Sequence, residues 1–313
     1  MARLTLFPSL AQDLRHALRA LRRSPGFTAA AVTTLALGIG ANAALFSVIS
    51  AVLLRPPPYR DPDRLVTLTT YQASAPEDDN ATSLPDLRDW QAQNTVFEGV
   101  AGYGFNRYEL NGPEGVDLAR AVMGTDNLFS VLGARPLAGR VLTPSDDHQA
   151  VVVLSHRLWM QRYGGSADVI GRTVRLYQDP YTIVGVMPAG FHFPTPDIDL
   201  WTSLEPIYRS SGKGSVADWL TNRSLRGYRV VARLKPGITA EAAGAQMQAL
   251  QQRLAQSYPE SDAGLGVTVR SLRESTVAGF RRPLLLLLGA AGLVLLIACV
   301  NLAHLLLART STR

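Results

Sequence analysis

Residues 283–308 read PLLLLLGAAGLVLLIACVNLAHLLLA and contain no charged side chain. Fifteen of these 26 residues are Leu, Ile or Val, and a helix needs about 20 mostly apolar residues to cross the hydrocarbon core of a membrane. Even if Asn301 and His304 cost as much as charged residues, about 3 kcal/mol each, the aliphatic residues, worth roughly −0.3 to −0.6 kcal/mol each, would offset them. We therefore predict a transmembrane helix over residues 283–308.

A second uncharged block covers residues 24–54 and holds twelve Leu, Ile, Val or Phe residues. We predict a second transmembrane helix over residues 25–54. The alternative is a cleaved signal peptide, because Ala41-Asn42-Ala43 has the form of a cleavage site. The apolar run continues for eleven residues beyond Ala43, which favours an uncleaved anchor.

Small and polar residues in the two blocks predict helix contacts. Ala36, Gly40 and Ala44 recur every four positions, a spacing that lets membrane helices approach closely, so the first helix is expected to have a partner helix. Asn301 and His304 lie three residues apart on one face of the second helix. A polar pair at membrane depth serves either interhelical hydrogen bonding or a substrate or proton path, and both roles stay open.

The net charge of +6 is concentrated at the two ends of the chain. Five of the 31 Lys and Arg residues precede residue 24 and two follow residue 308, whereas Asp13 is the only acidic residue in these end segments. We predict a cytoplasmic amphipathic helix over residues 1–24, lying on membrane lipid, and a cytoplasmic tail over residues 309–313. Since residues 24–308 carry no net charge, no nucleic-acid partner is expected.

The long segment between the two blocks predicts an α+β fold. Strands are expected at 65–71, 96–110, 116–123, 150–154, 173–177, 181–186, 199–204, 228–234 and 266–272, and helices at 84–93, 126–132, 155–163 and 239–257. A β-α-β unit at each end of this segment encloses a middle section in which strands and helices follow a different pattern. We therefore predict a large extracytoplasmic domain of two subdomains between the two transmembrane helices. A split β-α-β subdomain (residues 55–122 and 216–282) would be interrupted by an inserted, β-rich subdomain (residues 123–215), with the loop at 211–215 marking the second boundary.

No catalytic constellation is found in the sequence. The chain has no G-x-x-x-x-G-K-[ST], no H-E-x-x-H and no C-x-x-C motif. His148, His156 and His192 lack a second His or Cys at ligand spacing, so we expect them to be surface or packing residues. No catalytic residue, cofactor or metal is predicted, and the protein is not expected to be an enzyme.

The acidic residues and the single cysteine also give no indication of a catalytic site. Asp146-Asp147 and Glu77-Asp78-Asp79 are expected to form acidic turns without catalytic geometry. Asp197 and Asp199 are expected to be acidic residues of the same kind, without catalytic geometry. Cys299 is the single cysteine and lies in the second apolar block, so the segment between the blocks cannot contain a disulfide.

Several motifs together resemble MacB/FtsX-type ABC transporter permeases, especially the branch with internally duplicated permeases. They are DLRHALR (13–19), SPGFT (24–28), LALGIGAN (35–42), LGARP (132–136), VVLS (152–155), GRTV (171–174), IVGVMP (183–188) and LIACVNLAHLLLAR (296–309). The resemblance implies a MacB-like periplasmic core domain of two subdomains, a bacterial inner-membrane location and an ABC-type ATPase as partner. It also implies two further spans after the second helix, so the chain is expected to be the N-terminal portion of such a permease.

The expected function is therefore that of a permease subunit that couples cytoplasmic ATP hydrolysis to its periplasmic domain for export or efflux. A second copy of the chain, a second permease half and a periplasmic adaptor are the candidates for further partners. The alternative is a two-span membrane sensor with an extracytoplasmic ligand-binding domain, and a membrane-anchored enzyme is a weaker third reading.

Overall fold

The computed structural model describes residues 25–49, 59–112, 115–146, 149–177, 179–204 and 216–311. The chain divides into two compact units. We call Met1–Arg55 with Val277–Arg313 the helical unit, and Pro56–Thr276 the sheet unit. The predicted helix at 1–24, the boundary loop at 211–215, Asp147 and His148 lie outside the described residues.

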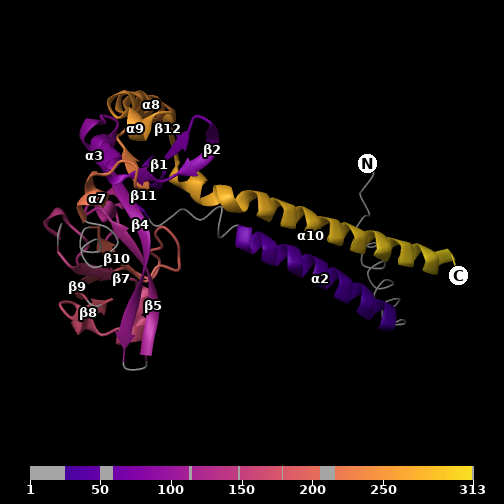
Figure 1. Cartoon of the computed structure of the whole chain (residues 1–313). Helices are drawn as coiled ribbons and strands as arrows, with labels where there is room; N and C mark the ends of the chain where they lie inside the picture. Colours follow the sequence, from indigo (N-terminus) through magenta and orange to yellow (C-terminus); the bar gives the residue numbers. More distant parts are fainter. Residues whose placement is uncertain are drawn as a thin grey trace, which may run out of the picture. The chain divides into compact units, whose positions relative to one another are not determined.

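The described residues of the helical unit form two helices that run side by side, α2 (Pro25–Ile49) and most of α10 (Leu272–Ser311) (Figure 1). Pro25 begins α2, a position where its missing N–H leaves no hydrogen bond unmade. Within the described residues, no helix combines the length and the apolar character needed to cross a membrane.

The sheet unit is built on one 12-stranded sheet. Nine of the strands follow the order β12-β1-β11-β4-β5-β10-β7-β9-β6, while β2, β3 and β8 pair beside this path. The strands are β1 (Leu65–Gln72), β2 (Ala75–Asn80), β3 (Thr82–Ser83), β4 (Phe97–Gly112), β5 (Gly115–Gly124), β6 (Ala138–Gly139), β7 (Val151–Leu154), β8 (Thr173–Leu176), β9 (Asp179–Val186), β10 (Leu200–Ser203), β11 (Arg226–Leu234) and β12 (Leu265–Ser271).

The first and last strands of the sheet unit are neighbours. β1 pairs antiparallel with β12 from Val66↔Ser271 to Gln72↔Leu265, and on its other edge it pairs antiparallel with β11. The chain therefore enters β1 and leaves β12 at the same end of this ladder.

Short polar caps start the main helices of the sheet unit. Ser83 accepts a hydrogen bond from the Asp86 N–H at the start of α3 (Leu84–Gln93), and Ser155 and Thr239 do the same for α5 (His156–Tyr163) and α8 (Ala240–Ser257). Such caps satisfy N–H groups that have no partner within the helix. The shorter helices are α4 (Leu128–Leu132), α7 (Val216–Thr221), α9 (Pro259–Asp262) and the 3₁₀ turns η2 (Pro62–Arg64), η3 (Pro144–Asp146) and η4 (Ala167–Val169).

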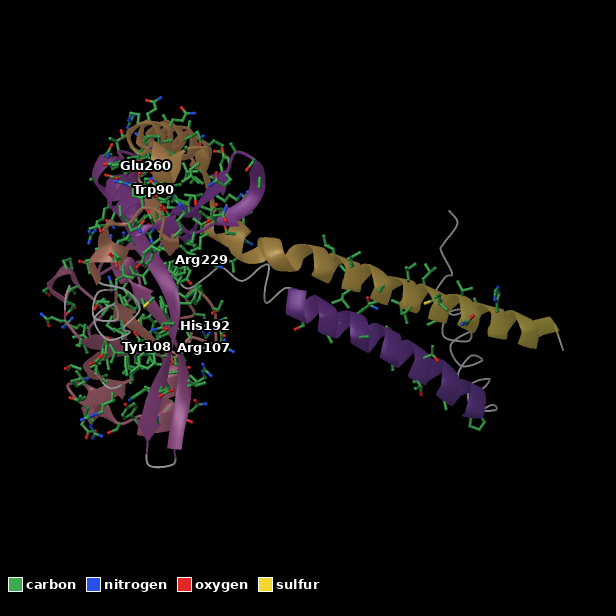
Figure 2. All side chains as sticks on the ribbon, viewed as in Figure 1. Trp90, Arg107, Tyr108, His192, Arg229 and Glu260 are labelled. Atoms are coloured by element: carbon green, nitrogen blue, oxygen red, sulfur yellow. The ribbon has the colours of Figure 1, made fainter. Side chains whose placement is uncertain are left out.

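Apolar side chains form two buried clusters in the sheet unit. The larger one contains the inward faces of α3 and α8, where Leu87 and Met247 are fully buried, and it extends to Tyr108 on β4. Within it the Trp90 indole N–H donates to the Gln251 side chain at 3.1 Å, joining α3 to α8. Figure 2 shows Trp90 and Tyr108 among the side chains that fill this unit. The second cluster packs α4 and an aromatic group against the sheet, with Phe129, Phe193 and Trp201 at its centre.

The mixed fold and most elements agree with the sequence prediction. Helix α3 has the predicted bounds, and α8 begins after its predicted cap Thr239. Residues 77–79 were expected to form a turn, which is wrong: they lie in β2, which pairs with β1 through Thr70↔Asn80 and Gln72↔Ala75. The subdomain boundaries stay a prediction, since β5 continues the sheet directly into β10 through Leu200↔Ala121.

Candidate functional site

A glycine and an asparagine make the contact between α2 and α10 in the helical unit. The Asn42 side-chain amide donates to the Gly38 carbonyl at 2.9 Å and to the Ala291 carbonyl on α10 at 3.2 Å. Gly38 is buried against Leu295, and a Cβ added there would lie 2.8 Å from Leu295 Cδ1. The two helices therefore meet where a side chain is missing and an amide bridges the backbones.

The small and polar residues singled out in the sequence lie elsewhere on these helices. Ala36, Gly40 and Ala44 are exposed on α2, and Gly40 has no atom within 4 Å of where its Cβ would stand. Asn301 and His304 are exposed on α10. Their contact with a partner helix stays a prediction. The contact through Gly38 and Asn42 was missed, although an asparagine inside an apolar block was a usable signal.

The sheet unit passes directly from β12 into α10. Strand β12 ends at Ser271 and α10 begins at Leu272, whose side chain is buried in the second apolar cluster. The hydroxyls of Thr67 and Ser275 lie 2.6 Å apart, and the Ser275 hydroxyl also contacts the Ser271 carbonyl at 3.0 Å. The first turn of α10 is thereby tied to both β12 and β1.

A buried charged cluster holds α3, α9 and the start of β11 together. Arg226 donates to Asp86 at 2.9 Å and to Asp262 at 2.8 Å, and Arg223 donates to Asp86 at 2.6 Å and to Asp89. Both Asp86 and Asp262 are fully buried. The Arg223 guanidinium also stacks 3.6 Å from the Tyr258 ring centre. Because each buried carboxylate has an arginine partner, the cluster joins residues that are distant in the sequence.

Two buried aspartates of the sheet unit have pKa values displaced in opposite directions. Burial, followed by the nearby Asp86 carboxylate, raises the pKa of Asp262. Burial also acts to raise the pKa of Asp146, but hydrogen bonds from Arg140 and Thr143 outweigh it and hold that pKa below its usual range. These bonds give Asp146 a structural role at the 3₁₀ turn η3.

Of the two described histidines of the sheet unit, His156 has a packing contact and the side chain of His192 is exposed. The His156 ring packs edge-on against Trp159 at 5.5 Å, and the His192 carbonyl accepts a hydrogen bond from the Tyr59 hydroxyl at 2.6 Å. Among the described residues, no three His, Cys, Asp or Glu side chains are grouped so that they could hold a metal ion.

Comparisons with known proteins identify one family. The family described as the MacB-like periplasmic core domain matches residues 28–250, which is more than half of the chain. No curated protein matches.

Thirty chains of solved structures match the fold. The periplasmic region of MacB from Actinobacillus actinomycetemcomitans aligns with a TM-score of 0.51 and 13% identity, over 76% of this chain and 98% of that one. A domain of a proposed permease protein from Porphyromonas gingivalis aligns with a TM-score of 0.50 and 16% identity, over 68% and 91% of the two chains. At such identities the likeness concerns the fold alone.

Proposed function

Because the chain belongs to the family of the MacB-like periplasmic core domain, found in permeases of ABC transporters, we propose that it is a membrane subunit of a MacB/FtsX-type ABC transporter. The family match over residues 28–250 is the observation that carries this proposal. The subunit works with a separate ABC ATPase and catalyses no reaction itself. Its sheet unit lies in the periplasm, where it handles a substrate or a partner during export.

The proposal places the helical unit in the inner membrane. Support comes from the two uncharged blocks, residues 24–54 and 283–308. It also comes from large apolar side chains that are exposed on the helices, with 58% of Ile39 on α2 and 75% of Leu286 on α10 accessible. Apolar surface of this extent on paired helices fits a lipid environment.

The membrane location is tested in intact spheroplasts that contain the full chain. We expect added protease to cut the sheet unit, while the helices stay in the membrane pellet after extraction at alkaline pH. A sheet unit that is protected in spheroplasts and cut only after lysis would reverse the proposed topology. Release of the chain into the alkaline supernatant would exclude the two spans.

The proposed coupling runs through the first turn of α10. Support comes from the direct passage of β12 into α10 and from the contact between Thr67 and Ser275. A movement of the helix that the ATPase drives would be passed to β1 and β12 with little slack, because a hydrogen-bonded helix and a strand ladder are both stiff.

The test of function is co-purification of the tagged full chain from bacterial membranes. We expect an ABC ATPase of the MacB or lipoprotein-release type in the eluate. Recovery of a histidine kinase or a cyclase and no ATPase would overturn the proposal in favour of the two-span sensor.

The same purification separates the two open roles of Asn301 and His304. A chain with Asn301→Leu and His304→Leu that still assembles with its ATPase but loses transport would assign the pair to a substrate or proton path. Loss of assembly would assign it to helix packing. The Asn42→Leu variant serves as the comparison for helix packing, because the Asn42 amide on α2 donates a hydrogen bond to the Ala291 carbonyl on α10.

A further inference from the structure

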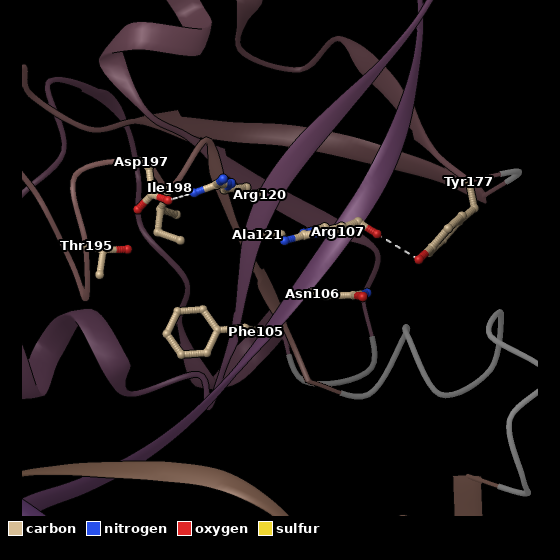
Figure 3. Close-up of a pocket in the computed structure, with 9 residues that line it drawn as sticks. All are labelled: Phe105, Asn106, Arg107, Arg120, Ala121, Tyr177, Thr195, Asp197 and Ile198. Carbon is tan, nitrogen blue, oxygen red and sulfur yellow. Dashed lines mark hydrogen bonds and ion pairs between the residues drawn. The ribbon is translucent and has the colours of Figure 1, made fainter.

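A hollow of about 530 Å³ lies over the hairpin of β4 and β5 (Figure 3). Its floor is the sheet, and its walls include Tyr177 on one side and Asp197 and Ile198 on the other. The volume falls in the range of sites for small molecules. All of its lining belongs to the sheet unit.

Two arginines are cross-strand neighbours on this floor. In the antiparallel pairing of β4 with β5, Arg107 lies directly opposite Arg120. Like charges in this position repel each other. Asp197 forms an ion pair with Arg120, whereas no partner is recorded for the Arg107 guanidinium among the residues that the structure describes. A second carboxylate, that of Asp199, accepts a hydrogen bond from the Arg120 backbone N–H at 3.0 Å but forms its ion pair with Arg157 at 2.8 Å. Of the two guanidinium groups, that of Arg120 therefore has a carboxylate partner and that of Arg107 has none among the described residues.

The position of Arg107 is fixed by its backbone. The Tyr177 hydroxyl donates to the Arg107 carbonyl at 2.7 Å, and the next residue, Tyr108, is fully buried in the core. A strand held in this way presents the Arg107 side chain on the solvent face of the sheet, because successive side chains alternate between the two faces.

An apolar surface adjoins the arginines. Phe105 lies two residues before Arg107 on the same face of β4, and 46% of its surface is exposed. The Arg229 guanidinium lies 5.3 Å from the Phe105 ring centre. Figure 3 shows Phe105 and Ile198 bordering the same part of the hollow as Arg120. A large exposed aromatic ring near an arginine that has no described partner suits a ligand that is charged at one end and apolar at the other.

We propose that this hollow binds a small organic anion. Its carboxylate or similar anionic group lies between Arg107 and Arg120, and its aromatic or alkyl group lies along Phe105 and Ile198. A guanidinium binds such a group through two parallel hydrogen bonds. The anion supplies a negative charge for Arg107, which Asp197 does not pair with, and it competes with Asp197 for Arg120.

The probe is 4-(trifluoromethyl)benzoate, titrated into the full chain in detergent and followed by fluorine NMR, with the uncharged 4-(trifluoromethyl)benzamide as its neutral match. We expect the benzoate to bind more tightly than the amide and to bind more weakly as salt is added. Arg107→Gln is expected to weaken the benzoate by about tenfold or more. The matched control is Arg253→Gln, which removes an exposed arginine from α8 and leaves the affinity unchanged.

The Asp197→Asn variant gives the sharpest result, because a merely structural role cannot produce it. Removal of the competing carboxylate is expected to tighten benzoate binding by several-fold. Equal affinities of the Arg107→Gln and Arg253→Gln chains, equal binding of benzoate and amide, or no binding at millimolar concentrations would overturn the proposal. If inorganic phosphate displaces the probe as well as unlabelled benzoate does, the proposed contact of the ligand with Phe105 and Ile198 is overturned. Far-UV circular dichroism of each variant verifies that it is folded.

Discussion

Single backbone positions control how α4 and α5 end. Gly133 and Gly164 both follow the last helical residue in the left-handed conformation, with φ of 65° and 59°. They differ in their surroundings: a Cβ on Gly133 would lie 2.7 Å from the Arg60 Cβ, whereas a Cβ on Gly164 would meet nothing within 4 Å. A side chain at Gly164 would therefore cause backbone strain alone, whereas a side chain at Gly133 would also conflict sterically with Arg60.

Alanine at these positions is expected to cost different amounts of stability. Gly164→Ala should lower the free energy of unfolding by about 1 kcal/mol through backbone strain alone. Gly133→Ala should lower it by about 3 kcal/mol, because displacement of Arg60 adds to the strain. Tryptophan fluorescence during chemical unfolding measures both values, since all four tryptophans (Trp90, Trp159, Trp201 and Trp219) lie in the sheet unit. Equal losses would contradict the contact with Arg60.

The two displaced aspartates predict opposite dependences of stability on pH. The pKa of Asp262 is raised above 3.8, so the folded chain holds this proton more tightly and the contribution of Asp262 to stability falls as pH rises through the folded pKa. The pKa of Asp146 is lowered, so its contribution is present above about pH 4 and is lost as pH falls through its folded pKa.

Asparagine substitutions test these two opposite dependences of stability on pH. As pH rises above about pH 4, the unfolding free energy of Asp262→Asn should rise relative to that of the unsubstituted chain. That of Asp146→Asn should fall relative to it as pH rises toward about pH 4 from below, and should stay level above that pH. Urea unfolding at a series of pH values gives both curves. Parallel curves for the two variants would show that the charged clusters around these aspartates differ from those described.

At the scale of elements, the contact between α2 and α10 has a geometry that a disulfide would fit. A Cβ on Gly38 would lie 4.0 Å from the Leu295 Cβ, and disulfides join Cβ atoms about 3.5–4.5 Å apart. In a Cys299→Ala background, Gly38→Cys with Leu295→Cys is expected to form an intramolecular disulfide under mild oxidation, detected by its mobility in non-reducing electrophoresis.

The control for this prediction moves one cysteine by half a turn. Gly40→Cys with Leu295→Cys should stay reduced, because nothing lies near the side-chain position of Gly40. If the second pair forms its disulfide as readily as the first, α2 is rotated relative to the described contact.

Elements with local signals could be predicted from the sequence. Leu84, Leu87 and Trp90 repeat on one face of α3 behind the Ser83 cap, and the four buried residues of β7 read as a core strand. β2 could not be found in this way, because acidic residues 77–79 oppose a strand assignment and only pairing with β1 places them there.

The candidate sites were harder to predict, since they depend on long-range pairing. Arg107 and Arg120 are separated by a hairpin and become neighbours only through the register of β4 and β5. Likewise, Asp86 meets Arg226 across 140 positions of sequence. Small-residue spacing on α2 indicated that a partner helix was to be expected, but it could not distinguish Gly38 from Gly40.

At the scale of the whole molecule, α10 is a described helix that extends across a boundary between the two units. It runs from Leu272 to Ser311, and the boundary between the units falls between Thr276 and Val277. Proline at position 277 removes a helical N–H and clashes with the preceding turn, at a cost of about 3 kcal/mol. Val277→Pro is therefore expected to break α10 next to its first turn.

Hydrogen exchange detects this break. We expect the amides around position 277 to lose protection in Val277→Pro, while the paired amides of β1 and β12 keep theirs. Val277→Ala is the matched control and should leave both regions protected. Loss of protection throughout the sheet unit would mean that α10 is needed for its fold and does more than link the two units.

The neighbouring positions of β1 and β12 also have a mechanical meaning. The chain enters at Leu65 and leaves at Ser271 on adjacent strands, so a pull that separates these two points acts across the ladder and loads its rungs one at a time, as in a zipper. Pulling along the strands would load all rungs together and meet far more resistance. The first rung to part would be Val66↔Ser271, and the bond between Thr67 and Ser275 closes the zipper at that point.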